Sequence, residues 1–156
     1  MNFWLALHII AAGTWLGCNV AQVVMGARIS SAGTEVRAWW SDAGEFLGKA
    51  VYPAAGALIL ITGLIMVITS NDPGGYSFAS AFVSIGFVAV VIGGVLGGVV
   101  FGPKNRAAGE AIRAGDAAAE SKARSTILNF AYLDTAIVVF TIFMMVYKVG
   151  AKYKGL

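Results

Sequence analysis

The side chain best able to do chemistry in this 156-residue chain is His8, its only histidine. An imidazole can ligate a metal ion or haem iron, exchange a proton, or hydrogen-bond a neighbouring carbonyl. His8 stands in a run, residues 1–27, that contains no Asp, Glu, Lys or Arg. A helix of about 20 apolar residues crosses the hydrocarbon core of a membrane, where ionisable groups are costly and mark functional sites. His8 is therefore the first candidate functional residue.

A heptad-spaced seam of larger and polar side chains surrounds this histidine. Spacings of four and three residues place the seam on one face of a helix, and its His and Gln indicate that it faces protein rather than lipid. On the seam, Ala11 separates His8 from Trp15. A small residue between two large ones leaves either a gap for a flat ligand lined by Trp15 or room for a side chain from a neighbouring helix. The seam consists of Trp4, His8, Ala11, Trp15, Cys18 and Gln22.

Methionines are the candidate partners of His8. At ~1.5 Å rise per residue, His8 lies roughly 8–10 Å inside its helix end. Met66, Met144 and Met145 fall at the same level if their spans are antiparallel neighbours. One imidazole and up to three thioethers could ligate haem iron as a His/Met pair or hold a copper ion. Alternatively, the methionines fill gaps in the core and His8 hydrogen-bonds a carbonyl.

Asp134 is the second costly residue, because it interrupts an otherwise uncharged run between Arg124 and Lys148. It lies about 12 Å inside its span at ~1.5 Å per residue, too far along the membrane to be the partner of His8. The intramembrane polar residues available to it are Asn19, Gln22 and Asn129. Asp134 is either held neutral by a structural hydrogen bond, to Asn19, Asn129 or the backbone, or is one step in a proton path.

The composition indicates that lipid is the main solvent of the chain. Hydrophobic residues make up 58% of it and charged residues only 12%, compared with roughly 25% charged in soluble domains. A domain of this size has too little interior to hide that much apolar surface. The net charge of +3 is modest, and nothing indicates a nucleic-acid surface.

Four uncharged runs predict an all-α membrane protein, an up-down bundle of four transmembrane helices in a single domain. The first run lacks a positive n-region and exceeds the apolar core of a signal peptide, so we interpret it as an uncleaved span. The predicted spans are residues 2–27, 50–70, 77–102 and 125–147.

Eight of the eleven Lys and Arg residues lie in two predicted loops, 28–49 and 103–124. The positive-inside rule places these loops in the cytoplasm and both termini outside, although three lysines in the tail oppose it. Loop 28–49 is amphipathic and contains Trp39–Trp40, which predicts an interfacial helix with an aromatic belt.

Loop 103–124 predicts two helices divided at Gly115. Asp116 is placed to cap the second helix, which we expect to begin in water and continue into the bilayer. Glu120 and Arg124 then form an i, i+4 pair on an exposed face.

Glycines suggest how the spans associate, because helices in lipid pack closely at small residues. The small-xxx-small repeats serve either packing within the bundle or docking of a second copy or a partner subunit. They comprise Gly13 and Gly17 in the first span and Gly93, Gly94, Gly97 and Gly98 in the third.

Other chemistries lack their motifs in this sequence. It contains no nucleophile triad, phosphate loop, HExxH or CxxC, and Cys18 is its only cysteine. Hydrolase, kinase and thiol-redox functions are therefore unsupported.

The segment Ala6–Gly17, with Leu7-His8 followed one heptad later by Trp15-x-Gly17, resembles the first helix of a group of small bacterial membrane proteins. The group includes the CopD-like copper proteins, the four-helix protoporphyrinogen oxidases and an uncharacterised branch. Pro53 followed by Leu60–Leu64, and Asp134 followed by Phe143–Lys148, resemble the uncharacterised branch.

The resemblance implies a multi-pass protein of the bacterial inner membrane. The oxidase branch of the group is associated with haem b bound through the first-helix histidine, which implies haem b at His8. This chain departs from the oxidases, which use a lysine at the start of their third helix, because residues 77–84 contain none. It also has fewer His and Met residues than the copper proteins, and Lys148-Val149 replaces the Lys-Pro of the uncharacterised branch.

Three functions therefore remain open. The first is a haem-b-binding membrane protein, redox-active through its haem, in which His8, Trp15 and the methionines form the cofactor site. The second is a non-catalytic membrane subunit that packs through its glycine-rich helices in a homo-oligomer or larger complex. The third is copper handling.

Overall fold

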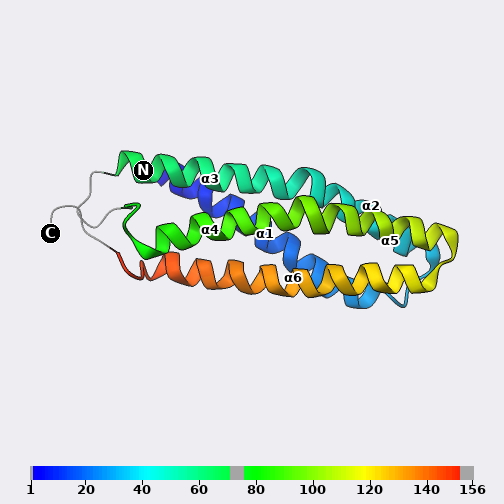
Figure 1. Cartoon of the computed structure of the whole chain (residues 1–156). Coiled ribbons are helices and arrows are strands. Elements are labelled where there is room, and N and C mark those ends of the chain that lie inside the picture. The colour runs from blue at the N-terminus through cyan, green and yellow to red at the C-terminus, as the bar shows by residue number, and fades with distance from the viewer. Residues whose placement is uncertain (1, 71–75, 152–156) are drawn as a thin grey trace.

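The computed structural model describes residues 2–70 and 76–151, and all regular structure in them is helical (Figure 1). The all-α four-helix prediction is thus confirmed. The elements are α1 (Asn2–Ile29), α2 (Thr34–Phe46), the π-helical turn η1 (Leu47–Val51), α3 (Tyr52–Thr69), α4 (Ala81–Leu96), the π-helical turn η2 (Gly97–Phe101), α5 (Gly102–Ala114) and α6 (Ala117–Val146).

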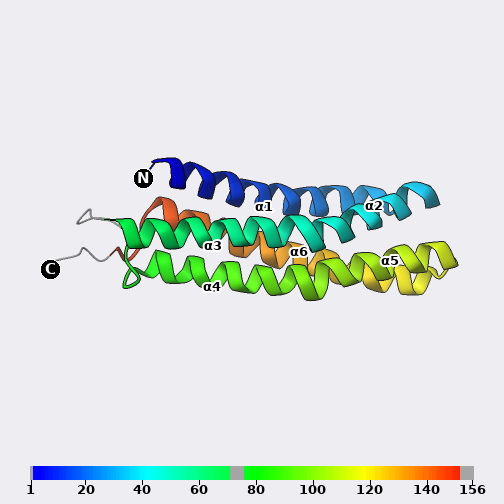
Figure 2. The ribbon, with the colours of Figure 1, turned by 90° about the horizontal axis from the view of Figure 1, so that it is seen from above.

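Two of the four long helices are composite rods. The first rod joins α2, η1 and α3 over 36 residues, and the second joins α4, η2 and α5 over 34 residues (Figure 2). Within the described residues, four helices are long and apolar enough to cross a membrane, so the chain is a polytopic membrane protein. At ~1.5 Å per residue each rod exceeds a hydrocarbon core of ~30 Å, so each extends beyond it.

The bundle has two different ends. The terminal end holds the start of α1 and the end of α6 (Figure 1). The charged end holds α2, α5 and the first turns of α6, and most of the ion pairs lie there. Each predicted span corresponds to one of the four long helices. The helix that carries the third predicted span begins at Ala81, and the helices that carry the second, third and fourth continue into the charged end.

The prediction of an interfacial helix in loop 28–49 is wrong. Helix α2 continues through η1 into α3 and packs along α5, so it follows the bundle axis (Figure 2). Nothing between residues 34 and 53 breaks the helix strongly enough to turn it into the membrane plane.

A proline follows each π-helical turn, Pro53 after η1 and Pro103 after η2. Proline inside a helix lacks its N–H and pushes on the carbonyl four residues earlier, and a wider turn ahead of it relieves that clash. The two turns lie side by side: a Cβ built on Gly48 would stand 2.5 Å from the backbone nitrogen of Gly102. Glycine at position 48 is what lets the rods touch there.

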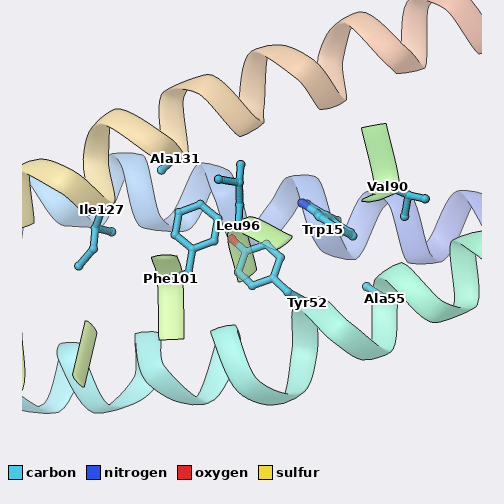
Figure 3. Packing of buried hydrophobic residues seen from close by; sticks show 8 residues of the cluster. All are labelled: Trp15, Tyr52, Ala55, Val90, Leu96, Phe101, Ile127 and Ala131. Atoms are coloured by element: carbon cyan, nitrogen blue, oxygen red, sulfur yellow. The ribbon is translucent and has the colours of Figure 1, made fainter. Parts of the chain in front are cut away.

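An aromatic core fills the bundle beside these turns (Figure 3). The Tyr52 ring stacks on Phe101 with centroids 5.3 Å apart, and Trp15 meets Tyr52 edge-on at 5.6 Å. This core fixes the position of Trp15, which also belongs to the site described below. The buried cluster is Trp15, Tyr52, Ala55, Val90, Leu96, Phe101, Ile127 and Ala131.

At the charged end, Gly115 ends α5 with a φ of 73°, and Asp116 accepts a 2.9 Å hydrogen bond from the Ala119 amide, as predicted. Glu120 does pair with Arg124, at 2.8 Å, but the predicted exposed face is wrong. Glu120 is only 6% exposed because α2 covers it and supplies a second partner, Arg37, at 2.7 Å.

The glycines face two different surroundings. Cβ atoms built on Gly93 and Gly97 would meet Trp15 and Tyr52, so these two glycines pack within the bundle. By contrast, nothing in the described residues comes within 4 Å of a Cβ built on Gly13, Gly17, Gly94 or Gly98.

Candidate functional site

A cavity of about 450 Å³ lies between α1, α3, α4 and α6, on the terminal side of Trp15. Its lining is largely aliphatic and aromatic, and it includes both His8 and Trp15. Ala11, which stands between them on the predicted seam, is 3% exposed and is not among the lining residues, so the gap suggested at Ala11 itself stays a prediction. The walls of the cavity come from all four spans, so residues distant in the sequence share one site.

One polar partner of His8 is a hydroxyl. His8 Nδ1 lies 2.9 Å from Thr62 Oγ1, and Thr62 Oγ1 in turn lies 2.6 Å from the Leu58 carbonyl oxygen. A hydroxyl has one proton, and Thr62 uses it on a backbone carbonyl of its own helix (Ile59 is the alternative acceptor at 3.2 Å). Thr62 therefore accepts from His8, and Nδ1 carries the proton of the neutral imidazole.

This tautomer leaves the lone pair on Nε2 of His8. Ligating histidines commonly donate their other ring N–H to a fixed oxygen, which orients the ring and increases its basicity. The ring lies against α3 at Gly63, where a built Cβ would be in van der Waals contact with Cε1 at 3.4 Å. His8 thus lies in the cavity wall with one ring nitrogen hydrogen-bonded to α3.

The structure brings two of the three candidate methionines to the cavity. Met66 and Met145 line it together with His8. Met144 is not among the lining residues and packs instead against the cluster of Val67, Phe82 and Val83. In the described part of the chain, no three His, Cys, Asp or Glu side chains come together.

Asp134 lies directly behind the cavity wall. The indole N–H of Trp15 donates to Asp134 Oδ2 at 2.8 Å, and the side-chain amide of Asn19 donates to the same oxygen at 2.7 Å. Asn19 was among the predicted partners; Trp15 was expected only to line the cavity. Asn129 is exposed, away from Asp134.

Two further hydrogen bonds extend this network. The Tyr52 hydroxyl donates to Asn19 Oδ1 at 2.6 Å, and Gln22 donates to the Tyr52 hydroxyl at 2.8 Å. Starting from Gln22, every donor points toward Asp134, and the network joins α1, α3 and α6. Sequence reasoning missed Tyr52, whose only signal was a tyrosine next to Pro53 at the start of an apolar run.

A second cavity, of about 20 Å³, lies between Gln22 and the charged end. Its lining includes Ser41, Asn105 and Arg124, and its volume suffices for about one water molecule. The Arg124 Nη2 atom is buried without a hydrogen-bond partner in the described residues. The polar network and the ion pairs of Glu120 thus approach each other across a water-sized space.

These features define a polytopic membrane protein whose four spans line an apolar, partly open cavity, with one imidazole in its wall and a buried carboxyl behind it. Comparisons with models of protein families, with curated proteins and with solved structures found no match. Any assignment of function therefore depends on the site itself.

Proposed function

We propose that this protein binds haem b in the cavity, with His8 as axial ligand through Nε2. The observation that supports this most directly is the Thr62 hydroxyl, which takes the Nδ1 proton and leaves Nε2 free to bind iron. Bound haem would supply one-electron redox chemistry, which makes the protein redox-active in the membrane.

The cavity suits such a group in size and lining. Small-molecule sites typically measure about 300–1,000 Å³ and are mostly apolar, as this cavity of about 450 Å³ is. Met66 and Met145 are the thioethers available for a second axial position. Lys148 places an ammonium 5.5 Å from the ring centre of Tyr76, a cavity-lining residue, and so adds positive charge for a propionate.

The test is reconstitution of the purified protein with haemin, followed by absorption spectroscopy. We expect a Soret band in the wild type and in Met144→Leu, a matched control outside the cavity. His8→Ala should lose the band, and added imidazole should restore part of it. A Soret band unchanged in His8→Ala would contradict the proposal. Copper bound after copper loading, without haem binding, would favour copper handling instead.

A second candidate function, a non-catalytic membrane subunit, is supported by three glycines that lie outside the cavity and face no neighbour in the described part of the chain, Gly17, Gly94 and Gly98. In this case a second copy or a partner helix would pack on them. The test is the size of the detergent-solubilised assembly in Gly94→Leu and Gly98→Leu. An unchanged size would remove the support for this function.

We also infer that both termini lie outside a bacterial inner membrane, with the charged end in the cytoplasm, because most Lys and Arg residues gather there. In a Cys18→Ser background, an impermeant maleimide should label Lys148→Cys in intact cells and label Arg113→Cys only after lysis. The reverse pattern would invert the orientation.

A further inference from the structure

We propose that Asp134 is a proton-binding site, that it holds a proton on Oδ1, and that it exchanges this proton as the charge in the neighbouring cavity changes. The coupling to a redox change rests on the haem proposal above. The proton-binding site itself does not, and the two are tested separately.

The hydrogen bonds of Asp134 are unequal on its two oxygens. Oδ2 accepts from both Trp15 and Asn19, whereas Oδ1 has no partner among the described residues, and the side chain is 0% exposed. A neutral carboxyl in this geometry leaves one hydroxyl unpaired, but an ionised one leaves a buried anionic oxygen unpaired. The second is the costlier state, because unpaired buried charge loses more solvation than an unpaired neutral group.

Among the residues that the structure describes, no cation compensates a charge at this position. Asp134 is faced by Trp15 and Asn19 from α1, by Gly93 from α4, and through Asn19 by Tyr52 from α3. Helix α4 has no ionisable residue, and α3 has only Tyr52. The other ionisable residues of α1 are His8, Cys18 and Arg28, and those of α6 are Glu120, Lys122, Arg124 and Tyr132. The arginines lie toward the charged end, where Arg124 is already paired with Glu120.

Trp15 connects the two sites. Its indole lines the cavity and at the same time donates to Asp134. Gly93 and Gly56 lie against the ring, so the indole cannot turn away without a clash or the loss of its hydrogen bond. Because the lining of the cavity is mostly apolar, a charge placed there acts on the carboxyl with less screening than it would in bulk water.

The network on the other side of Asp134 holds the carboxyl and is a poor proton carrier. Asn19 and Gln22 are amides, which lack a hydroxyl that could pass a proton onward, and they stand on either side of the Tyr52 hydroxyl. We therefore place the proton exchange on the side of Trp15 and the cavity. Reduction of an oxidised occupant by one electron from a chemical reductant would be balanced by one proton taken from water onto Oδ1.

The first experiment needs no cofactor. Infrared spectra of the cofactor-free protein in lipid vesicles should show the C=O stretch of a buried protonated carboxyl at neutral pH. Asp134→Asn should remove this band, Trp15→Phe should shift it, and Asp116→Asn, a surface control, should leave it unchanged. A wild-type spectrum without the band, or a band that persists in Asp134→Asn, would overturn the proposed site.

The second experiment uses the haem-loaded protein. One proton taken up per electron lowers the midpoint potential by about 59 mV for each unit rise in pH. We expect the midpoint potential to fall with rising pH in the wild type and in Asp116→Asn. In Asp134→Asn we expect the Soret band to remain and the pH dependence of the potential to be lost. A wild-type potential independent of pH, or an equal slope in Asp134→Asn, would refute the coupling. If no haem binds, the haem proposal fails and the infrared result alone decides the role of Asp134.

Discussion

Two adjacent glycines of α4 allow a matched test of the packing around Trp15. A Cβ built on Gly93 would overlap the Trp15 ring and stand 3.1 Å from Asp134 Oδ1, whereas one built on Gly94 meets nothing within 4 Å. Both changes to alanine gain helix propensity, about 1 kcal/mol each. The chemistry and the helix are the same, so any difference between the two variants measures the packing.

For Gly93→Ala we expect a net loss. Trp15 cannot move aside, because its indole is bonded to Asp134 and its ring meets Tyr52, so the overpacking cost lies near the upper end of the usual range, about 3 kcal/mol. After the gain in propensity, Gly93→Ala should be less stable by about 2 kcal/mol and Gly94→Ala more stable by about 1 kcal/mol.

The assay is unfolding in mixed detergent micelles, followed by near-ultraviolet circular dichroism. A difference of about 3 kcal/mol corresponds to a gap of roughly 6–12 °C between the two melting temperatures. Equal melting temperatures would refute the proposed Gly93–Trp15 contact. Destabilisation by Gly94→Ala would instead indicate that another chain covers this face, as the membrane-subunit function requires.

Three further predictions follow from other contacts. Gly48→Ala places a methyl group against the backbone of the second rod, so it should destabilise the protein by about 3 kcal/mol or more and lower its melting temperature. Gly98→Ala is the control: its methyl group meets no neighbour in the described residues, so the melting temperature should not fall. Thr62→Val removes the acceptor for Nδ1 of His8, so haem affinity in a spectroscopic titration should fall about 10- to 100-fold. Thr62→Ser keeps the hydroxyl and should retain the affinity. Equal affinity in the two variants would count against the assignment of the proton to Nδ1. Glu120→Gln leaves two guanidinium groups, of Arg37 and Arg124, without their anion, so unfolding at pH 7 should require about 2 kcal/mol less. A free energy of unfolding equal to that of the wild type would contradict this.

Much of the architecture follows from the sequence because a chain in lipid must satisfy its own backbone hydrogen bonds and needs about 20 apolar residues to cross the membrane. The length of each uncharged run was sufficient to predict four helices, and the polar seam on α1 indicated which of its faces meets protein. Ala11, Trp15 and Gln22 are indeed buried. The proximity of Asn19 and Asp134 followed from depth alone, since both lie near the same level of antiparallel helices.

The parts that the sequence did not reveal depend on tertiary contacts. Glu120 has the surroundings of a surface residue along its own helix, and only the arrival of α2 buries it. Met144 and Met145 are adjacent, yet the rotation of α6 lets only Met145 line the cavity. The Trp15–Asp134 bond joins a residue expected to line a ligand site with one expected to bind an amide, and no local pattern connects them.

The two π-helical turns have a consequence for how the length of this chain can change. Each turn holds one residue more than an α-helical turn and so advances the phase of its rod by about 100°. Deleting one residue from the first rod alone would rotate α2 by that angle and take Ser41 and Gly44, now buried, away from the bundle interior. Because η1 and η2 meet at one height, through Gly48 and Gly102, the rods are matched in phase there. An insertion or deletion near one proline therefore calls for a compensating change near the other, although the two positions are distant in the sequence.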